Sequence, residues 1–317
     1  MQVLSFDMAE DKAKEERKVW FNGNMIPYSQ VKVPILTHSL QYGSGIFEGI
    51  RSYPSPAGSN VFRLKEHMER FMRTARIYGM NLGYSLDQLM GAVKETVQVN
   101  KLGSCYIRPF AFIDDDSISI STKGKNISVA VAAIPYDSIF GSSKMEGIRC
   151  KVSSWKRLNS SILPVQAKAS GNYLNSIIAL NEAVMLGYNE TILLSQNGYV
   201  AEGSGENIFI VKDGKIITPG DDSDILLGIT RDTVITIVEE MGLEVMMRNI
   251  HRDELYGANE IFLCGTAAEV APVIMVDGTE ISGGKAGKIT SELSSKYDSI
   301  VNGKSSKHMN WIYPVTF

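Results

Sequence analysis

The chain has 317 residues, of which 44% are hydrophobic, so it can fill the cores of about two globular domains. Its 32 basic and 35 acidic residues are spread along the sequence and give a net charge of −3, which argues against a nucleic-acid-binding patch. The three cysteines lie far apart and the four histidines never take a metal-ligand spacing. We therefore expect buried free thiols and no metal site.

The N-terminal region carries a charged run at residues 7–18 and lacks the apolar segment of a signal peptide. No apolar stretch approaches the length of a membrane-spanning helix. These features predict a cytoplasmic protein without a membrane partner.

The first part of the chain predicts a small α/β domain over residues 1–134. Asn22-Gly23 between short apolar runs is typical of a β-hairpin, because this pair adopts the positive φ angles of a two-residue turn. Apolar residues at helical spacing predict two helices, and Ser85 is expected to cap the second. The expected elements are a hairpin at 19–26, strands at 46–53 and 61–64, helices at 65–78 and 85–100, and strands at 104–113 and 127–134.

Residues 135–147 combine proline, glycine, aspartate and serine without periodicity, which predicts an interdomain loop. A larger domain at 148–317 follows, with hairpin signals at 197–198 and 213–214. Its interleaved helices and hairpin-linked strands favour an α+β fold over a dinucleotide-binding parallel sheet. The expected elements are helices at 174–186, 230–241 and 286–301, and strands at 148–153, 191–195, 199–201, 207–211, 215–218, 244–247, 260–264 and 269–275.

Lys168 lies among small residues, directly before an apolar helical run. Small neighbours let other groups approach the amine closely, and a Schiff-base nucleophile needs a sheltered, neutral amine. A solvated lysine in a turn before a helix would show the same pattern. The rest of the chain has to decide between these interpretations.

Three separated segments have the character of anion-binding sites. A glycine-led turn runs into a helix at 228–232, and small residues at 264–269 could form a nest of backbone amides. Arg63 lies on an apolar strand, where a cation needs solvent or an anion. Taken one at a time, the simpler explanations of the first two segments are an N-cap and a close-packed corner. Together with Lys168, the three segments suggest a phosphorylated cofactor that forms an imine.

Two further segments could recognise a flat ligand and a carboxylate. Glu202 and Glu206 lie among glycines after a hairpin turn, where a carboxylate could keep a ring nitrogen protonated and so favour transamination. Strand alternation puts Tyr106 and Arg108 on one face, as a clamp for a carboxylate. A polar turn, and an Arg108 paired with an aspartate of the next loop, are the simpler explanations.

Seven motifs, in this order, resemble the branched-chain aminotransferases of the class IV pyridoxal-phosphate family. The resemblance extends from about residue 19 to residue 297 and implies a two-domain enzyme of fold type IV. Its larger C-terminal domain would have a barrel-like core of mixed sheets. The motifs lie at residues 38–49, 61–63, 106–109, 167–173, 202–207, 228–232 and 265–269.

The resemblance also implies how pyridoxal 5′-phosphate is held. Lys168 would form the Schiff base and shuttle the proton between the substrate Cα and C4′ of the cofactor. Glu202 would pair with the pyridine nitrogen, and Tyr173 with the ring hydroxyl. The phosphate would be held by Arg63, the backbone of Ile229 and Thr230, and Thr266.

The substrates implied by the resemblance are amino acids and 2-oxo acids. Amides of Thr266 and Ala267, with Tyr106, would take the α-carboxylate, and Arg108 would take the distal carboxylate of glutamate. The reaction would move an amino group from branched-chain L-amino acids (leucine, isoleucine, valine) to 2-oxoglutarate. Family members are homodimers or larger oligomers, in which a loop of one subunit closes its neighbour's site. The side-chain pocket would be lined by Tyr42, Phe47 and Tyr136.

Three departures from the family pattern bear on side-chain specificity. Tyr136 and Ile139 stand where the bacterial pattern has a tryptophan and a tyrosine, residues 114–116 lack a glycine-bearing loop, and Cys264 replaces a frequent serine. Three alternatives stay open: a D-amino-acid or (R)-amine transaminase on the same fold, an aminodeoxychorismate-lyase-like enzyme, and a non-catalytic cofactor-binding protein. The motifs at 106–109 and 265–269 favour the branched-chain L-amino-acid interpretation.

Overall fold

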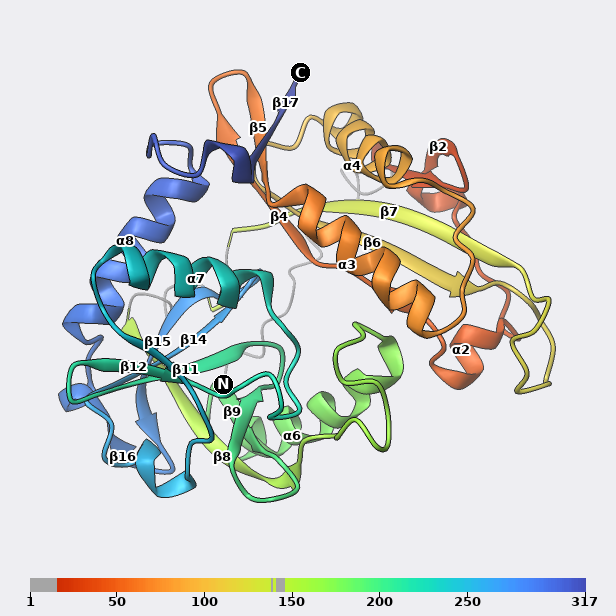
Figure 1. Ribbon diagram of the computed structural model, residues 1–317. Coiled ribbons are helices and arrows are strands. Elements are labelled where there is room, and N and C mark those ends of the chain that lie inside the picture. The colour runs from red at the N-terminus through yellow and green to blue at the C-terminus, as the bar shows by residue number, and fades with distance from the viewer. Residues whose placement is uncertain (1–15, 138, 141–145) are drawn as a thin grey trace. The chain divides into compact units, whose positions relative to one another are not determined.

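The computed structural model describes residues 16–137, 139–140 and 146–317 and divides into two compact units (Figure 1). Unit 1 contains the described residues up to Tyr136 together with Tyr313–Phe317, and unit 2 spans Asp137–Ile312. The final residues thus join the first unit, whereas the sequence placed them in the C-terminal domain. Residues 138 and 141–145 of the predicted interdomain loop lie outside the described residues, and the domain boundaries drawn from the sequence stay a prediction.

Unit 1 is built on one eight-stranded sheet in the order β17-β5-β4-β6-β7-β1-β2, with β3 paired to β6. The predicted hairpin is confirmed, because Phe21 pairs with Asn24 and the turn residues Asn22 and Gly23 have φ angles of 48° and 90°. The edge strand β17 was not predicted. The strands are β1 Lys18–Phe21, β2 Asn24–Pro27, β3 Ile46–Phe47, β4 Ile50–Ser55, β5 Gly58–Phe62, β6 Cys105–Ile113, β7 Ile127–Pro135 and β17 Ile312–Thr316.

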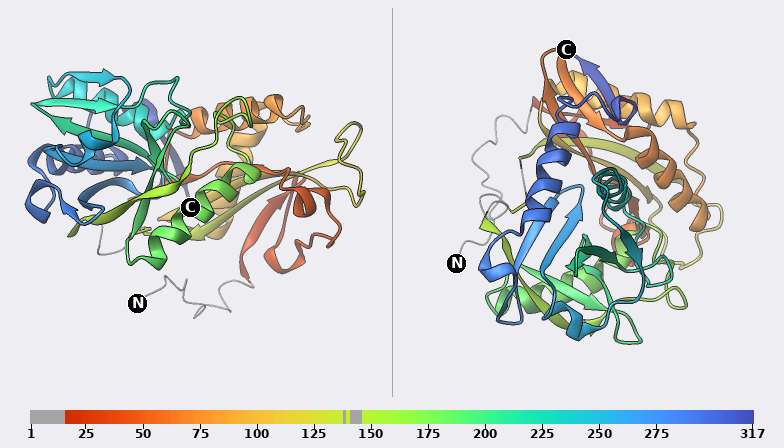
Figure 2. Two further views of the ribbon diagram at one scale, coloured as in Figure 1. Left: turned by 90° about the horizontal axis from the view of Figure 1, so that it is seen from below. Right: turned by 60° about the vertical axis from the view of Figure 1, so that its left-hand side comes forward.

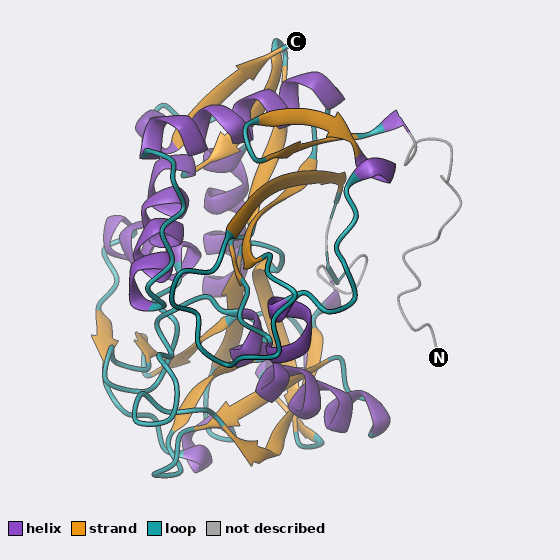
Figure 3. Ribbon diagram, turned by 90° about the vertical axis from the view of Figure 1, so that its right-hand side faces the viewer, coloured by secondary structure: helices purple, strands orange, loops and turns teal. Residues whose placement is uncertain are grey.

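The helices of unit 1 form a second layer. Helices α3 (Leu64–Ile77) and α4 (Leu86–Asn100) pack against each other and against the sheet (Figure 3). Ser85 caps α4 as predicted, in a capping box with Gln88. The prediction for Arg63 was wrong: β5 ends at Phe62, and Arg63 adopts a left-handed conformation (φ 49°) directly before α3. The chain turns from strand to helix within that one residue.

Unit 2 contains a nine-stranded sheet in the order β10-β9-β8-β15-β14-β11-β12-β13, with β16 paired to β15. Strand β10 also pairs with β11, so six strands close into a ring. The predicted barrel-like core of mixed strands is confirmed. The strands are β8 Ile148–Lys156, β9 Glu190–Leu194, β10 Val200–Gly203, β11 Asn207–Lys212, β12 Lys215–Thr218, β13 Val245–Met247, β14 Glu260–Gly265, β15 Glu269–Val276 and β16 Thr279–Glu280.

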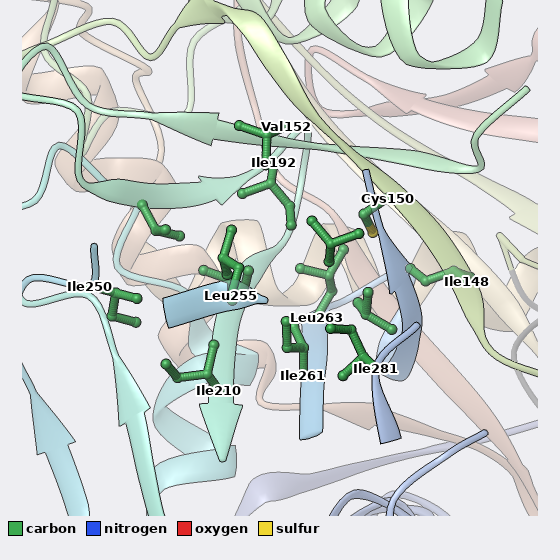
Figure 4. Packing of buried hydrophobic residues seen from close by; sticks show 14 of the residues in the cluster. Ile148, Cys150, Val152, Ile192, Ile210, Ile250, Leu255, Ile261, Leu263 and Ile281 are labelled. Atoms are coloured by element: carbon green, nitrogen blue, oxygen red, sulfur yellow. The ribbon is translucent and has the colours of Figure 1, made fainter. Parts of the chain in front are cut away.

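Aliphatic side chains from these strands fill the core of unit 2 (Figure 4). Ile192, Ile210, Ile261 and Leu263 are almost completely buried in this cluster, and burying branched side chains of this kind is the main source of folding free energy. Cys150 belongs to the same cluster. All three cysteines are buried and free, as predicted.

Three long helices complete unit 2: α6 (Tyr173–Met185), α7 (Ile229–Glu240) and α8 (Lys288–Val301). Each coincides with a predicted helix to within about two residues. Helix α6 lies along β8 and β9 (Figure 2). No helix in the described parts of the chain is long and apolar enough to cross a bilayer. The short helices are α2 His38–Tyr42, η1 Tyr28–Gln30, η2 Ser170–Asn172, η3 Arg252–Leu255, η4 Ser282–Gly284 and η5 Met309–Trp311.

Candidate active site

Lys168 lies in a tight turn that is held by hydrogen bonds. The N–H of Ala169 donates to the carbonyl of Ala167 at 3.0 Å, so Lys168 is the central residue of a three-residue turn. The buried amide of Asn172 donates to the carbonyls of Ala167 and Pro164, both at 3.1 Å. The alanines on either side are buried, whereas Lys168 is partly exposed. The turn therefore fixes the backbone on both sides of Lys168.

The amine of Lys168 is paired with a phenol. Its Nζ donates to Oη of Tyr173 at 2.7 Å, and it lies 5.3 Å from the centroid of that ring. Tyr173 is the first residue of α6, and the short helix η2 directly precedes it. The chain thus brings a primary amine and a hydroxyl together within five residues.

Glu202 on β10 is a buried carboxylate that accepts three N–H groups. Its Oε1 accepts from Nε of Arg157 at 2.7 Å, and its Oε2 accepts from Nδ2 of Asn207 at 3.2 Å and from the N–H of Leu226 at 3.0 Å. Burial raises the pKa of Glu202, while Arg157 and the amide of Leu226 oppose that rise. Because both oxygens accept N–H groups, this geometry favours the ionised form. A carboxylate has about four acceptor positions, so one remains on Oε1.

Two partners of Glu202 were missed by the sequence reasoning. Arg157 follows β8 directly, and its backbone is held by Leu194 and Gln196 of the neighbouring segment. Asn207 faces Glu202 in the β10–β11 register. Asn207 closes the motif at 202–207 and could have been found from its position there. Arg157 carries no local signal, because its role depends on the pairing of β8 with β9.

The two carboxylates that the sequence singled out have different surroundings. Burial, reinforced by Glu190, raises the pKa of Glu206 well above its usual value, and Lys168 acts against the rise. Oε2 of Glu206 accepts the N–H of Gly205 at 3.0 Å, whereas Glu202 has the guanidinium of Arg157. Of the two, Glu202 is therefore the carboxylate whose charge is better stabilised, because it has a guanidinium partner.

Two backbone turns lie near Asn207 of β11, namely the turn that leads into α7 and the turn between β14 and β15. Gly228 precedes α7, and a methyl group on it would overlap Oδ1 of Asn207. Ile229 and Thr230 form the first turn of that helix, where backbone amides and the helix dipole attract anions. Thr266 and Ala267 lie in the turn between β14 and β15. Cys264, just before this turn, pairs with Asn207 of β11.

In unit 1, aromatic rings surround Arg108. Its guanidinium lies 4.5 Å from the ring centroid of Phe47 and 5.1 Å from that of Tyr106, and Nη2 donates to the Tyr106 hydroxyl at 3.4 Å. The predicted common face of Tyr106 and Arg108 is confirmed. The Tyr136 ring lies 5.4 Å from that of Tyr106, so these four side chains form one group.

A second arginine extends this group and was missed by the sequence reasoning. Arg51 is buried on β4, opposite Tyr106 on β6. Its guanidinium lies 4.8 Å from the ring centroid of Tyr136 and 4.9 Å from that of Tyr53. Such cation–π contacts hold a buried guanidinium in a fixed place. Arg51 lies two residues after the motif at 38–49, and this proximity is the signal that could have identified it.

The remaining candidates of unit 1 lie elsewhere in that unit. Arg63 donates from Nε to Oε1 of Glu66 at 2.8 Å. Tyr42 is 44% exposed, packs against His38 of α2 and donates its hydroxyl to the carbonyl of Ile118. Within unit 2 the structure brings together Lys168, Tyr173 and Glu202, and within unit 1 it brings together the Arg108 group.

The departures from the family pattern leave these groups intact. Cys264 is completely buried on β14, and burial raises its thiol pKa, as expected of an unreactive packing residue. Asp114 accepts a hydrogen bond from the hydroxyl of Ser128, and Asp115 lies 3.8 Å from Nζ of Lys125. No group of histidine, cysteine and acidic side chains in the described ranges could hold a metal ion.

Comparison with known proteins identifies the family. The profile of the family "Amino-transferase class IV" matches residues 45–276. The branched-chain-amino-acid aminotransferase of Escherichia coli K12 is 40% identical over 301 residues, covering 94% of this chain and 97% of that protein.

Solved structures agree with this assignment. A branched-chain aminotransferase from the thermophilic archaeon Thermoproteus uzoniensis, with norvaline, is 46% identical and has a TM-score of 0.90; the match covers 94% of this chain and 99% of that one. The branched-chain amino acid aminotransferase of Thermobaculum terrenum, in its PLP-bound holo-form, is 34% identical with a TM-score of 0.91, covering 96% of this chain and 100% of that one. The chain belongs to the class IV aminotransferases and, within them, to the branched-chain aminotransferases.

Proposed function

We propose that this protein is a pyridoxal-5′-phosphate-dependent transaminase that moves the amino group of leucine, isoleucine or valine to 2-oxoglutarate. The single observation that carries the proposal is the arrangement in unit 2, where the amine of Lys168 is paired with Tyr173 and acts electrostatically on the buried Glu202. An amine, a phenol and an ionised carboxylate are the groups needed to bind a pyridine ring that carries an aldehyde and a hydroxyl.

The residues of the site fit the cofactor. The remaining acceptor position on Oε1 of Glu202 would receive the ring N–H, and Tyr173 would bind the ring hydroxyl. The cofactor, when bound, supplies an electron sink for the bond broken at the substrate Cα. Its phosphate would be held by the first turn of α7 at Ile229 and Thr230, by Thr266 and by Arg63.

Lys168 has two tasks in this proposal. Its amine would hold the cofactor covalently at rest. In the reaction, Nζ would move a proton between the substrate Cα and C4′ of the cofactor. The hydrogen bond to Tyr173 orients Nζ, and the turn fixed by Asn172 limits its movement. Arg157 and Asn207 donate to the two oxygens of Glu202, and these hydrogen bonds stabilise its charge.

The substrate would be recognised through its carboxylates. The amides of Thr266 and Ala267, with the hydroxyl of Tyr106, would bind the α-carboxylate, and Arg108 would bind the distal carboxylate of glutamate. The support is the observed pairing of Tyr106 with Arg108 on one face of unit 1. An apolar side chain would be enclosed by Tyr42, Phe47 and Tyr136.

We also propose that the protein acts in the cytoplasm as a homodimer or larger homo-oligomer, with a loop of one subunit closing its neighbour's site. The support is an apolar stripe on α6, where Leu174, Ile177 and Ile178 are 65%, 50% and 41% exposed. Exposed apolar patches of this kind mark contact surfaces. Sedimentation of the cofactor-loaded protein would test this point, and a monomer at micromolar concentration would contradict it.

The function is tested with purified protein and a panel of donors. We expect the near-ultraviolet and visible absorbance of bound pyridoxal phosphate, turnover of leucine, isoleucine and valine with 2-oxoglutarate, and loss of that turnover in Lys168→Ala. Turnover of D-donors would instead indicate the D-amino-acid or (R)-amine class, and pyruvate released from aminodeoxychorismate would indicate a lyase. A bound cofactor whose spectrum does not change with leucine or glutamate would indicate a non-catalytic protein.

A further inference from the structure

Glu48 is a completely buried carboxylate of unit 1, between β3 and β4. Arg70 of α3 donates from Nε to Oε1 at 2.6 Å and from Nη2 to Oε2 at 2.9 Å. Nδ1 of His67, also on α3, lies 2.8 Å from Oε2, and the N–H of Gly49 donates to Oε2 at 3.2 Å. His67 and Arg70 are themselves 2% and 4% exposed, so the whole network is shielded from bulk solvent.

The charge of Glu48 is stabilised by this network. Burial alone would raise its pKa, but Arg70 and His67 outweigh burial and hold the pKa well below its usual value. A buried ion pair is weak evidence that a fold is stable, because replacing it with apolar side chains of the same volume often leaves the stability unchanged or raises it. Its stronger effect is geometric, because a bidentate guanidinium fixes a carboxylate in position and orientation.

The segment 47–49, which carries Glu48, lies opposite β6. Phe47 pairs with Phe110 and Arg51 pairs with Tyr106 in one continuous register, and the N–H of Glu48 donates to the carbonyl of Pro109 at 2.9 Å. Neighbouring residues of an extended chain point to opposite faces of a sheet. Glu48 points to α3, so Phe47 and Gly49 face the other side, which also carries Tyr106 and Arg108.

The other face of this segment supports the two side chains that we assign to substrate carboxylates. A methyl group on Gly49 would overlap the Tyr106 hydroxyl, so the phenol lies directly on the Gly49 backbone. The Phe47 ring lies 4.5 Å from the Arg108 guanidinium. The segment 47–49 therefore carries Tyr106 and Arg108 on one side and is anchored by Glu48 on the other.

We propose that Glu48, held by Arg70 and His67, is a positioning residue for substrate binding. It fixes the segment 47–49 and thereby sets where the Tyr106 hydroxyl and the Arg108 guanidinium meet the carboxylates of the substrate. This inference rests on the proposed function, because it takes Tyr106 and Arg108 as the carboxylate-binding groups. Glu48 itself does not touch the substrate or the cofactor.

The test uses Glu48→Gln in the cofactor-loaded protein, since glutamine keeps the shape and removes the charge. The probes are 4-methylvalerate and glutarate, the carboxylate skeletons of leucine and glutamate without the amino group, titrated by the absorbance of the bound cofactor. We expect the Kd of both probes to rise about tenfold, because displaced carboxylate-binding groups lose much of their affinity. The KM for leucine and 2-oxoglutarate should rise similarly, with kcat and the absorbance maximum unchanged.

Val93→Ala on α4 is the matched control, because Val93 is completely buried in unit 1 but lies on another helix. It should lower the Tm while leaving the Kd of both probes unchanged. The inference is overturned if Val93→Ala and Glu48→Gln lower the Tm equally and also raise the Kd of 4-methylvalerate and of glutarate by the same factor. In that case a general loosening of unit 1 explains the weaker binding. A lower Tm with unchanged Kd in Glu48→Gln would also overturn the inference.

A second variant covers the case in which Glu48→Gln does not fold. Arg70→Lys keeps a cation on α3 but removes the bidentate fork, so it should raise the Kd of both probes by a smaller factor. Unchanged values in folded Arg70→Lys would overturn the inference. A wild-type protein that neither binds pyridoxal phosphate nor transaminates would overturn the proposed function and this inference with it. If the wild type is active but the variants bind both probes with unchanged Kd, only this inference is overturned.

Discussion

Arg157 donates its Nε to Oε1 of Glu202 at 2.7 Å, and both side chains are almost completely buried. The two residues lie 45 positions apart, on segments that meet only because β8 pairs with β9 and β9 with β10. Nη1 of Arg157 is buried and has no hydrogen-bond partner among the described residues. The cation thus acts mainly on Glu202, whose charge it protects against the effect of burial.

Arg157→Met should therefore lower activity without preventing cofactor binding. Without the guanidinium, burial raises the pKa of Glu202 further, so a neutral carboxyl would face the ring nitrogen. We expect kcat to fall about tenfold to a hundredfold, the effect of losing one charge-assisted hydrogen bond. Steady-state kinetics at saturating leucine measures this loss. Arg248→Met, at a partly exposed ion pair with Glu254, is the control and should retain full kcat. Equal kcat values in both variants would contradict the assigned role of Arg157.

Tyr173→Phe removes the hydroxyl that accepts from Nζ of Lys168 at 2.7 Å. The amine should then be oriented less well for proton transfer, and we expect kcat to fall about tenfold or more. The measurement is single-turnover reaction with leucine, followed by the absorbance of the cofactor. Tyr188→Phe, whose ring packs against Arg149 at the start of β8, is the matched control and should react at the wild-type rate. A wild-type rate in Tyr173→Phe would show that the hydroxyl has no part in the step.

Gly228→Ala tests the anion site at the start of α7. The added methyl group would overlap Oδ1 of Asn207 and lie 3.3 Å from Cβ of Arg231, so the helix start has to shift. Because the backbone amides of that turn would hold the phosphate, we expect the Kd of pyridoxal phosphate to rise about tenfold or more. Fluorescence titration of the apo-protein measures it. Gly257→Ala has open space around the new methyl group and should bind as the wild type does. Equal Kd values would exclude the α7 start from the phosphate site.

The stability of unit 1 should depend on pH through Glu48. The groups that face Glu48 are the guanidinium of Arg70 and the titratable imidazole of His67, both on α3. Its pKa is lowered in the folded protein from a usual value of 4.5, so the network contributes fully above that pH. As the pH falls below 4.5, the unfolded chain takes up the proton first, and the contribution is lost progressively toward the lower folded pKa.

Glu48→Gln removes the charge and so measures its contribution to the free energy of unfolding. We expect the variant to be less stable than the wild type by about 3 kcal/mol at neutral pH, the cost of breaking a buried ion pair. The difference in the free energy of unfolding should narrow below pH 4.5, and denaturant unfolding at a series of pH values measures it. A difference that stays constant from neutral pH to well below 4.5 would contradict the assigned charge state of Glu48.

The sequence by itself determined the local elements and the reactive lysine. The hairpin at Asn22-Gly23, the cap at Ser85 and the helix after Lys168 depend on neighbours within a few positions, where turn geometry and helical spacing act directly. Lys168 and Tyr173 meet for the same reason, because a single turn of chain separates them.

Only the tertiary structure decided which distant side chains share a buried charge. Arg157 reaches Glu202 through the ring of strands in unit 2, and Arg70 reaches Glu48 by packing of α3 on the sheet of unit 1. The left-handed conformation of Arg63 and the pairing of β17 with β5 likewise follow from how segments meet. A buried charge must find its partner wherever packing places one, so no pattern within a single segment of the sequence can identify the pair.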